Sequence, residues 1–141
     1  MTWVLELPYQ RPPKGLHAND RPHWRTKARS AAELRALVVA LAKAQNIPAM
    51  RRVSVQLVWV VGDHRKRDED GPDPMAKVIF DAIGSDRGVS ARIVHDDTSD
   101  YMEKPRPVIE HRAGATPHFE VRITDISNRP DTIDAVTRRL T

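Results

Sequence analysis

The chain has 141 residues and a mass of 16.0 kDa, and 40% of its residues are apolar, which predicts a single domain over 1–141 with a substantial core. Its 23 Lys and Arg against 19 Asp and Glu give a net charge of +4, a modest basic excess that fits a nucleic-acid partner and equally an ordinary surface. The chain has no cysteine and no apolar run near the ~18 residues of a membrane-spanning helix, which excludes disulfides, cysteine-ligated metal centres and a transmembrane segment.

The first third of the chain predicts a strand followed by a helix. Residues 2–7 are typical of a short strand that ends at Pro8. Two sites offer helix-start chemistry: Asp20 as an N-cap, and the Ser-Ala-Ala-Glu sequence of 30–33 as a capping box. The helix then runs to about Gln45, because apolar residues recur at helical spacing, namely Leu34, Leu37, Val38 and Leu41.

Residues 53–61 are the clearest strand of the chain. Every second residue from Val53 to Val61 is apolar, which is the pattern of a strand with one buried face. Val58 and Val60 make the other face apolar near the end of the strand. This pattern is expected for a central strand that is covered on both sides.

The second half of the chain predicts another helix and further strands. The helix begins near Asp73, which can act as its N-cap, and ends at Gly84. Gly114 is expected to turn the last two strands as a hairpin, and the strands are placed at 99–104, 108–111 and 119–123. Residues 125–141 are expected to form a weak C-terminal helix or a tail. The predicted fold class is α/β of the α+β type, with a mixed β-sheet of about four to five strands covered by two main helices.

Closely spaced carboxylates follow the 53–61 strand. Asp68 and Asp70 lie two residues apart, so their side chains point to the same side if the chain is extended there. Two such carboxylates repel each other unless a cation lies between them, and oxygen ligands suit a hard divalent cation. A second acidic pair, Asp96 and Asp97, lies further along. Each pair taken alone is more typical of a solvated surface turn than of a metal site.

Lys77 lies seven residues after Asp70, in the first turns of the predicted helix. One explanation is an ion pair with Asp73, four residues before it, which stabilises a helix by only ~0.3 kcal/mol. The functional explanation is a cation directed at a scissile phosphate, where it stabilises the charge that develops in the transition state. The basic residues at 65–67 favour a polyphosphate ligand beside the carboxylates.

Other catalytic patterns do not occur in the sequence. There is no G-x-G-x-x-G or Walker pattern to hold a nucleotide, and Gly71-Pro72 is interpreted as a plain turn into the helix. The six histidines do not have the helical spacing of a metal site, and no Ser-His-Asp elbow is present. We therefore expect no organic cofactor.

Taken in order, these motifs resemble the RusA-type Holliday-junction resolvases, particularly their phage and prophage members. That family carries an Arg-Asp-x-Asp-Asn step after a central strand, a lysine a few residues later, a helix with an internal Asp, and an Asp-Asp pair. This chain has Arg67-Asp68-Glu69-Asp70, then Lys77, then Phe80-Asp81-Ala82-Ile83, then Asp96-Asp97. Upstream, the segment 19–29 is similar to the family's Asn-x-x-Arg-x-His-Trp-x-x-Lys-Ala-Arg segment. The resemblance covers residues 3–124, most of the chain.

The resemblance implies a homodimeric, metal-dependent endodeoxyribonuclease that cuts branched DNA, the four-way junction, by symmetric nicks in recombination and repair. By position in the motifs, the catalytic set is Asp68, Asp70, Lys77 and Asp97, with the three carboxylates as ligands of Mg²⁺ and with Mn²⁺ as a substitute. Contacts to the DNA backbone are expected from Asn19, Arg21, Arg25, Lys27, Arg29, Arg65, Lys66 and Arg67. Gly71 departs from the pattern, because the family usually has Asn there.

Several alternatives stay open from the sequence. Asp96 could face the metal instead of Asp97, and Asp73 could stand in as a ligand. The protein could be a non-catalytic basic DNA-binding protein whose acids are only surface residues, or a related nuclease that acts on flaps or forks. We expect a cytoplasmic location, in the host cell if a phage encodes the protein, because residues 1–6 lack the features of a signal peptide.

Overall fold

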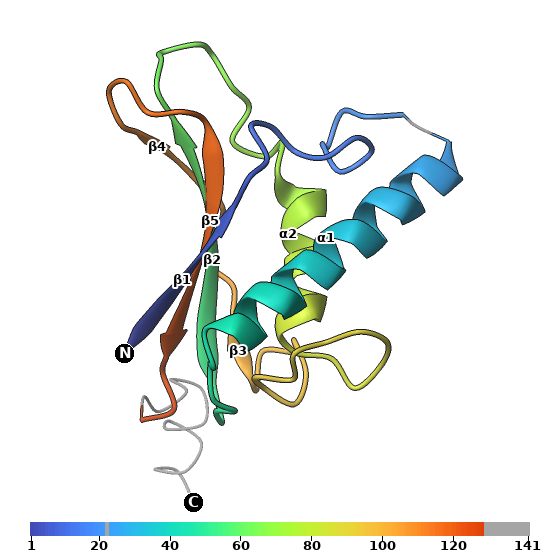
Figure 1. The fold of residues 1–141 in the computed structure, drawn as a ribbon, viewed down its shortest axis with the longest axis vertical. Coiled ribbons are helices and arrows are strands. Elements are labelled where there is room, and N and C mark those ends of the chain that lie inside the picture. Colours follow the sequence, from blue (N-terminus) through green and yellow to red (C-terminus); the bar gives the residue numbers. More distant parts are fainter. Residues whose placement is uncertain (22, 129–141) are drawn as a thin grey trace, which may run out of the picture.

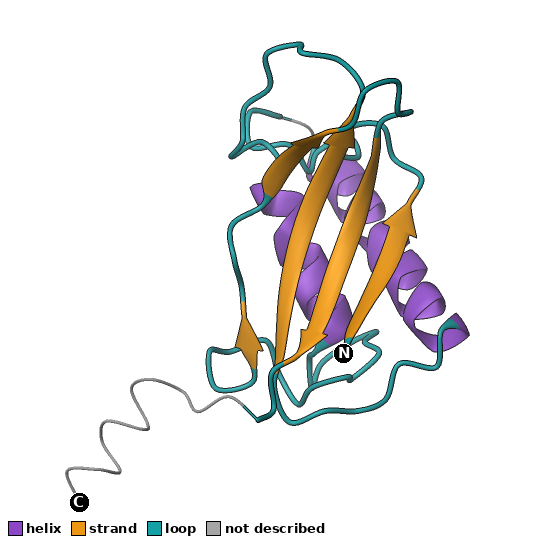
Figure 2. Ribbon diagram, turned by 90° about the vertical axis from the view of Figure 1, so that its left-hand side faces the viewer, coloured by secondary structure: helices purple, strands orange, loops and turns teal. Residues whose placement is uncertain are grey.

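The computed structural model describes residues 1–21 and 23–128, which form one mixed sheet with two helices. Along the chain the elements are β1 (Thr2–Leu7), α1 (Trp24–Ala44), β2 (Val53–Val61), α2 (Asp73–Ile83), β3 (Met102–Glu103), β4 (Val108–His111) and β5 (His118–Asp125). Both helices lie on the same face of the sheet (Figure 1 and Figure 2). The α+β fold predicted from the sequence is confirmed. No helix in the described part of the chain is long and apolar enough to cross a membrane.

β2 is the central strand of the sheet. β5 lies antiparallel along one side of it, with Leu57 opposite Val121, and β1 lies antiparallel on the far side of β5. The other edge of β2 is paired in two places, because β3 lies parallel to its beginning and β4 lies parallel to its end. The linker 104–107 between β3 and β4 therefore passes the middle of β2. There Gln56 Nε2 donates a hydrogen bond to the backbone oxygen of Arg106 at 2.9 Å.

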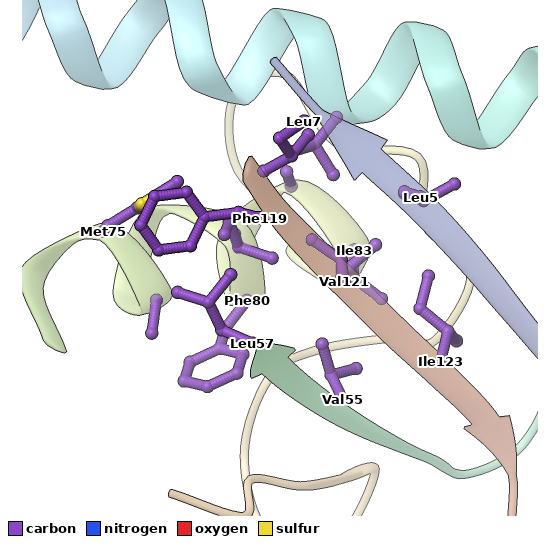
Figure 3. Packing of buried hydrophobic residues seen from close by; sticks show 14 of the residues in the cluster. Leu5, Leu7, Val55, Leu57, Met75, Phe80, Ile83, Phe119, Val121 and Ile123 are labelled. Carbon is purple, nitrogen blue, oxygen red and sulfur yellow. The ribbon is translucent and has the colours of Figure 1, made fainter. Parts of the chain in front are cut away.

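The core lies between the sheet and the two helices (Figure 3). Alternate side chains of β1, β2 and β5 point into it, including Leu5, Val55, Leu57, Phe119 and Val121. The helices contribute buried residues at helical spacing, among them Leu34 and Val38 of α1 and Met75, Ile79 and Ile83 of α2. Each large side chain buried in this way stabilises the fold by ~2 kcal/mol. The core thus fixes the end of β2 relative to the start of α2, and the candidate site lies between these two points.

The face of the sheet away from the helices is covered by charged side chains. Val58 and Val60 are fully buried although neither helix lies on their side of the sheet. In the strand register Val58 lies beside Glu120 and Val60 beside Glu110, so the valines share this face with an ion-pair network of Glu110, Arg112, Glu120 and Arg122. The sequence predicts that both faces of β2 are covered. One face is covered by the helices, and the other is covered by this ion-pair network and not by a helix.

Two local predictions at the start of α1 are wrong. The helix begins at Trp24, and the N-cap is His23, whose Nδ1 accepts a hydrogen bond from the backbone N–H two residues on at 3.2 Å. Asp20 instead accepts a hydrogen bond from the backbone N–H of Gly15 at 2.8 Å and closes the loop before the helix. Residues 30–33 lie inside α1, so their capping-box sequence does not mark a helix start.

The region after α2 also differs in part from expectation. The strand predicted at 99–104 is reduced to the two residues of β3. The hairpin expected around Gly114 is not formed, because β4 and β5 lie on opposite sides of β2. α2 begins at Asp73 and ends before Gly84 as predicted. The prediction of Asp73 as its N-cap is wrong, because the N-cap is Pro72 and no side-chain hydrogen bond caps the helix. The helix or tail predicted at 125–141 lies, from residue 129 on, outside the described residues.

Candidate functional site

The first acidic pair, Asp68 and Asp70, lies in a tight turn between β2 and α2, residues 68–71, which we call the acidic turn. Asp68 Oδ1 accepts a hydrogen bond from the backbone N–H of Asp70 at 3.0 Å, and Asp68 O accepts one from Gly71 at 3.0 Å. Because the chain turns here, the extended geometry considered for the sequence does not apply, and one carboxylate oxygen of Asp68 is used within the turn. Both carboxylates remain exposed. They precede the N-terminus of α2, where the helix dipole favours negative charge.

The loop before α1 packs on this turn. Ala18 N donates a hydrogen bond to Gly71 O at 2.9 Å, and the backbone N–H of Asn19 donates to His17 Nδ1 at 3.1 Å. In Figure 1 this loop runs past the start of α2 toward the N-terminus of α1. The contact brings the acidic turn and the N-terminal end of α1 to the same end of the molecule.

The residues of the 19–29 segment that were predicted to contact DNA surround the N-terminus of α1. All five of them are exposed: Asn19, Arg21, Arg25, Lys27 and Arg29. Trp24 beside them is 68% exposed, and the Arg25 guanidinium lies 5.3 Å from the centroid of its ring. The first turn of α1 carries no acidic residue. The helix N-terminus and these cations therefore form a positive surface that suits a phosphate backbone.

The three basic residues before the acidic turn, residues 65–67, differ in how exposed their side chains are and in how closely they pair with other groups. Arg65 and Lys66 are exposed, although Arg65 Nε lies 3.6 Å from the Asp63 carboxylate. The side chain of Arg67 is only 14% exposed and lies 2.9 Å from the same carboxylate. Its guanidinium also lies 5.7 Å from the ring centroid of Trp59. Arg67 therefore anchors the acidic turn to the end of β2, and Lys66 is better placed to meet a phosphate.

Asp97 lies near the C-terminal end of α2, beside Asp81. Burial raises the pKa of the Asp81 carboxyl, and the neighbouring Asp97 carboxylate raises it further. Asp97 accepts a hydrogen bond from Lys104 Nζ at 3.4 Å, and that ammonium group lies 5.2 Å from the ring centroid of Phe80. The sequence motif contains Asp81 but gave it no role, because spacing along the chain does not reveal that it faces Asp97.

The three carboxylates predicted as ligands are not gathered at one point. Asp68 and Asp70 precede α2, whereas Asp97 lies beside its last turns, and an 11-residue helix is roughly 16 Å long. Within residues 1–21 and 23–128, no three histidine, aspartate or glutamate side chains are placed to hold a metal ion. Carboxylates have the right chemistry for Mg²⁺. This arrangement does not complete a three-carboxylate site for it.

Both separated carboxylates are paired with cations from one segment, the linker 104–107. An Nη of Arg106 lies 2.7 Å from Asp70 Oδ1, and Lys104 Nζ lies 3.4 Å from Asp97 Oδ2. Arg106 and residues 66–70 together line a surface pocket of about 490 Å³. Sequence reasoning missed both cations, because the pairing of β3 and β4 with β2, which places the linker here, has no local signal in the sequence.

Lys77 is exposed in the first turns of α2, four residues before Asp81. The ion pair with Asp73 that would give it an ordinary structural role is not among the ion pairs of the described residues. Along the chain, Lys77 lies between the acidic turn before α2 and Asp81 near the end of the helix, and its side chain is exposed.

Comparison with known proteins identifies no family for this chain. No protein-family model matches the chain, and a search of curated proteins finds no similar sequence. The resemblance to RusA-type resolvases thus depends on the motifs quoted above.

Proposed function

We propose that this protein is a homodimeric, Mg²⁺-dependent endodeoxyribonuclease that resolves four-way DNA junctions in the cytoplasm by symmetric phosphodiester hydrolysis. The observation that carries the proposal is the pocket after β2, where the exposed carboxylates of Asp68 and Asp70 adjoin basic side chains. The hydrogen bond between Ala18 and Gly71 joins this turn to the exposed cations at the start of α1. A DNA backbone held by those cations would run past the carboxylates.

The signs of the charges favour a cation in this pocket. A DNA phosphate and an ionised carboxylate repel each other, so a surface that only binds DNA is weakened by Asp68 and Asp70. A divalent cation between the two groups turns this repulsion into attraction. When bound, it would also activate a water molecule as the nucleophile and stabilise the charge on the phosphate. Mn²⁺ is expected to replace Mg²⁺, because both accept carboxylate oxygens as ligands.

The residues of the chain have distinct roles in this proposal. Asp68 and Asp70 would hold the cation at the pocket, and Asp97 would be a ligand only in an arrangement that brings it closer to them. Lys77 neutralises charge on the scissile phosphate. The exposed basic residues of 65–66 and of the α1 N-terminus bind the backbone without reading sequence.

The second candidate function is a non-catalytic DNA-binding protein. One observation favours it: the ion pairs with Arg106 and Lys104 already neutralise Asp70 and Asp97, so these carboxylates have partners without a metal ion. A protein of this kind binds DNA equally well in EDTA and in Mg²⁺, and it never nicks a strand.

One assay separates these candidates. Purified protein is incubated with a mobile four-way junction, a flap, a fork and a linear duplex, each in Mg²⁺, in Mn²⁺ and in EDTA. The proposal predicts strand cleavage of the junction that depends on the metal ion. Preferential cleavage of the flap or fork would keep the nuclease and change its substrate. Metal-independent binding without any cleavage would favour the second candidate.

A further inference from the structure

Trp24, the first residue of α1, presents its ring to solvent. It is 68% exposed, and it is the only exposed aromatic residue among those that the structure describes. The imidazole of His23 lies 5.6 Å from it between ring centroids, tilted by 30°, and the Arg25 guanidinium lies 5.3 Å from its ring centroid. With these two neighbours in place, most of the Trp24 surface is still open to a flat ligand that stacks on it.

The charged side chains next to Trp24 in the sequence are all positive. Between residues 21 and 32 the chain carries cations and no acidic residue. These cations are exposed, namely Arg21, Arg25, Lys27 and Arg29. None of them belongs to an ion pair within the part of the chain that the structure describes. The carboxylate that precedes them, Asp20, accepts a hydrogen bond from the backbone N–H of Gly15 at 2.8 Å. The surface around Trp24 therefore attracts an anion.

An exposed indole among cations selects one kind of partner. A second copy of this chain docked through the same surface would bring like charges together, and like charges repel. Duplex DNA offers phosphates to the cations but hides the faces of its bases inside the stack. A single-stranded segment offers both, because its phosphates meet the cations and its bases present flat faces to the aromatic ring.

We infer that Trp24 is a stacking platform for an unpaired base, which makes the protein prefer DNA with unpaired bases over duplex DNA. At a branch point the stack of base pairs is interrupted, so a base leaves it at lower cost there. The hydrogen bond from Ala18 N to Gly71 O, 2.9 Å long, joins the loop before α1 to the acidic turn. A strand held at Trp24 therefore lies at the end of the molecule that carries Asp68 and Asp70. This inference rests on the DNA-binding part of the proposed function and deepens it, because it names the feature of the DNA that is selected.

DNA binding in EDTA tests the inference without metal and without cleavage. Fluorescence anisotropy measures the affinity of the full chain for two labelled probes, a single-stranded oligothymidine and a blunt duplex of the same length. The variants are Trp24→Ala, Trp24→Phe and Arg25→Gln. The matched control is Val89→Ala, which trims another exposed apolar side chain. Far-ultraviolet circular dichroism checks that each variant is folded.

Trp24→Ala is expected to bind the single strand about five- to a hundredfold more weakly than wild type, the range for loss of one stacked base, and the duplex within about twofold. Trp24→Phe keeps an aromatic ring and should stay within about threefold of wild type on both probes. Arg25→Gln should weaken binding of both probes by similar factors, because a cation that contacts phosphate does so in either form of DNA. Val89→Ala should bind both probes as wild type does.

Intrinsic fluorescence gives a second readout, which a purely structural role of Trp24 would not change. A base that stacks on Trp24 should quench its emission when the oligothymidine is added to wild type. The quenching should disappear in Trp24→Phe, although Trp3 and Trp59 are still present in that variant.

The outcomes separate the inference from the proposed function. Equal losses of Trp24→Ala on the single strand and the duplex, unchanged binding by that variant, or quenching that persists in Trp24→Phe would overturn the inference and leave the nuclease proposal in place. Failure of wild type to bind the single strand would overturn the inference as well. Intact junction strands with wild type in Mg²⁺, together with the expected loss in Trp24→Ala, would remove the nuclease and leave the inference in place.

Discussion

The imidazole of His17 fills the space beside Gly71. A Cβ atom at Gly71 would lie 2.5 Å from His17 Nε2 and 3.0 Å from the backbone oxygen of Asp68. The asparagine that RusA-type resolvases usually carry at this position would therefore displace the His17 imidazole. Glycine here is explained by the histidine that packs on the acidic turn.

Gly71→Asn is expected to destabilise the protein by ~1–3 kcal/mol, the range for side chains forced into an occupied space. His17→Ala in the same chain should recover part of that loss, because it empties the space. Urea unfolding of the two single variants and the double variant measures the coupling. Additive losses in the double variant would show that His17 does not determine the residue at 71.

Asp70→Asn should abolish cleavage of the junction and leave junction binding intact or tighter. The change removes a carboxylate from the proposed metal site, removes repulsion against phosphate, and frees the guanidinium of Arg106. Asp86→Asn, which removes an exposed charge from the loop after α2, is the matched control and should cleave normally. Nicking by Asp70→Asn at a rate close to that of wild type would exclude Asp70 from the site.

Lys77→Ala should slow single-turnover cleavage roughly a hundredfold, the usual loss when one donor to a developing negative charge is removed. Its Mn²⁺ affinity should not fall, because Lys77 acts on the phosphate and not on the cation. Its stability should change by well under ~1 kcal/mol, since the side chain is exposed. A cleavage rate within about threefold of wild type would reject the catalytic role.

The ion-pair network on the outer face of the sheet predicts a loss of stability in acid. Hydrogen bonds from Arg112, and then from Arg122 and His118, lower the pKa of Glu120 from 4.5 to about 2. A folded-state pKa below the unfolded one stabilises the protein fully above pH ~4.5, and this contribution disappears as the pH falls toward 2. Glu120→Gln should be less stable than wild type at pH 7 by ~1–3 kcal/mol, and the difference should shrink below pH 4.

Urea unfolding at a series of pH values measures this effect, with Glu103→Gln as a control because Glu103 is exposed on the short strand β3. The control should follow the wild-type profile. A Glu120→Gln variant whose deficit stays constant from pH 7 to pH 2.5 would show that Glu120 contributes through packing and not through its charge.

The proposed function predicts a homodimer with two-fold symmetry, because one chain has one set of the proposed catalytic residues and junction resolution needs two symmetric cuts. The proposed interface is the region 99–124 or the outer face of the sheet, which carries the ion-pair network of Glu110, Arg112, Glu120 and Arg122. Light scattering at micromolar concentration should give about twice the mass of one chain. A monomer under these conditions would contradict symmetric resolution by this protein.

The elements with strong periodicity were predictable from the sequence. β2 has the bounds read from its alternating apolar residues, and α2 has the bounds set by Asp73 and Gly84. Their apolar patterns are dictated locally, by burial of one face of each element. Asp68 and Asp70 were also found where the sequence placed them, directly between these two elements, although in a turn and not in an extended segment.

The features that depend on distant pairing were not predictable. The true partner of Asp20 is a backbone N–H five residues earlier, so its capping chemistry served a loop and not a helix. The positions of Lys104 and Arg106 follow from two short strands that share one edge of β2, a topology without a local sequence signal. The same holds for His17, whose contact with Gly71 joins segments far apart in the chain.

Mapping of incisions tests most directly whether the acidic turn makes this chain a metal-dependent junction nuclease. A four-way junction is labelled at the 5′ end of each strand in turn and incubated with wild type or Asp70→Asn, in Mg²⁺ and in EDTA. The proposal predicts paired nicks at symmetry-related positions in two opposite strands, only with wild type and only in Mg²⁺. Intact strands with wild type in Mg²⁺, or identical nicks with Asp70→Asn, would contradict it.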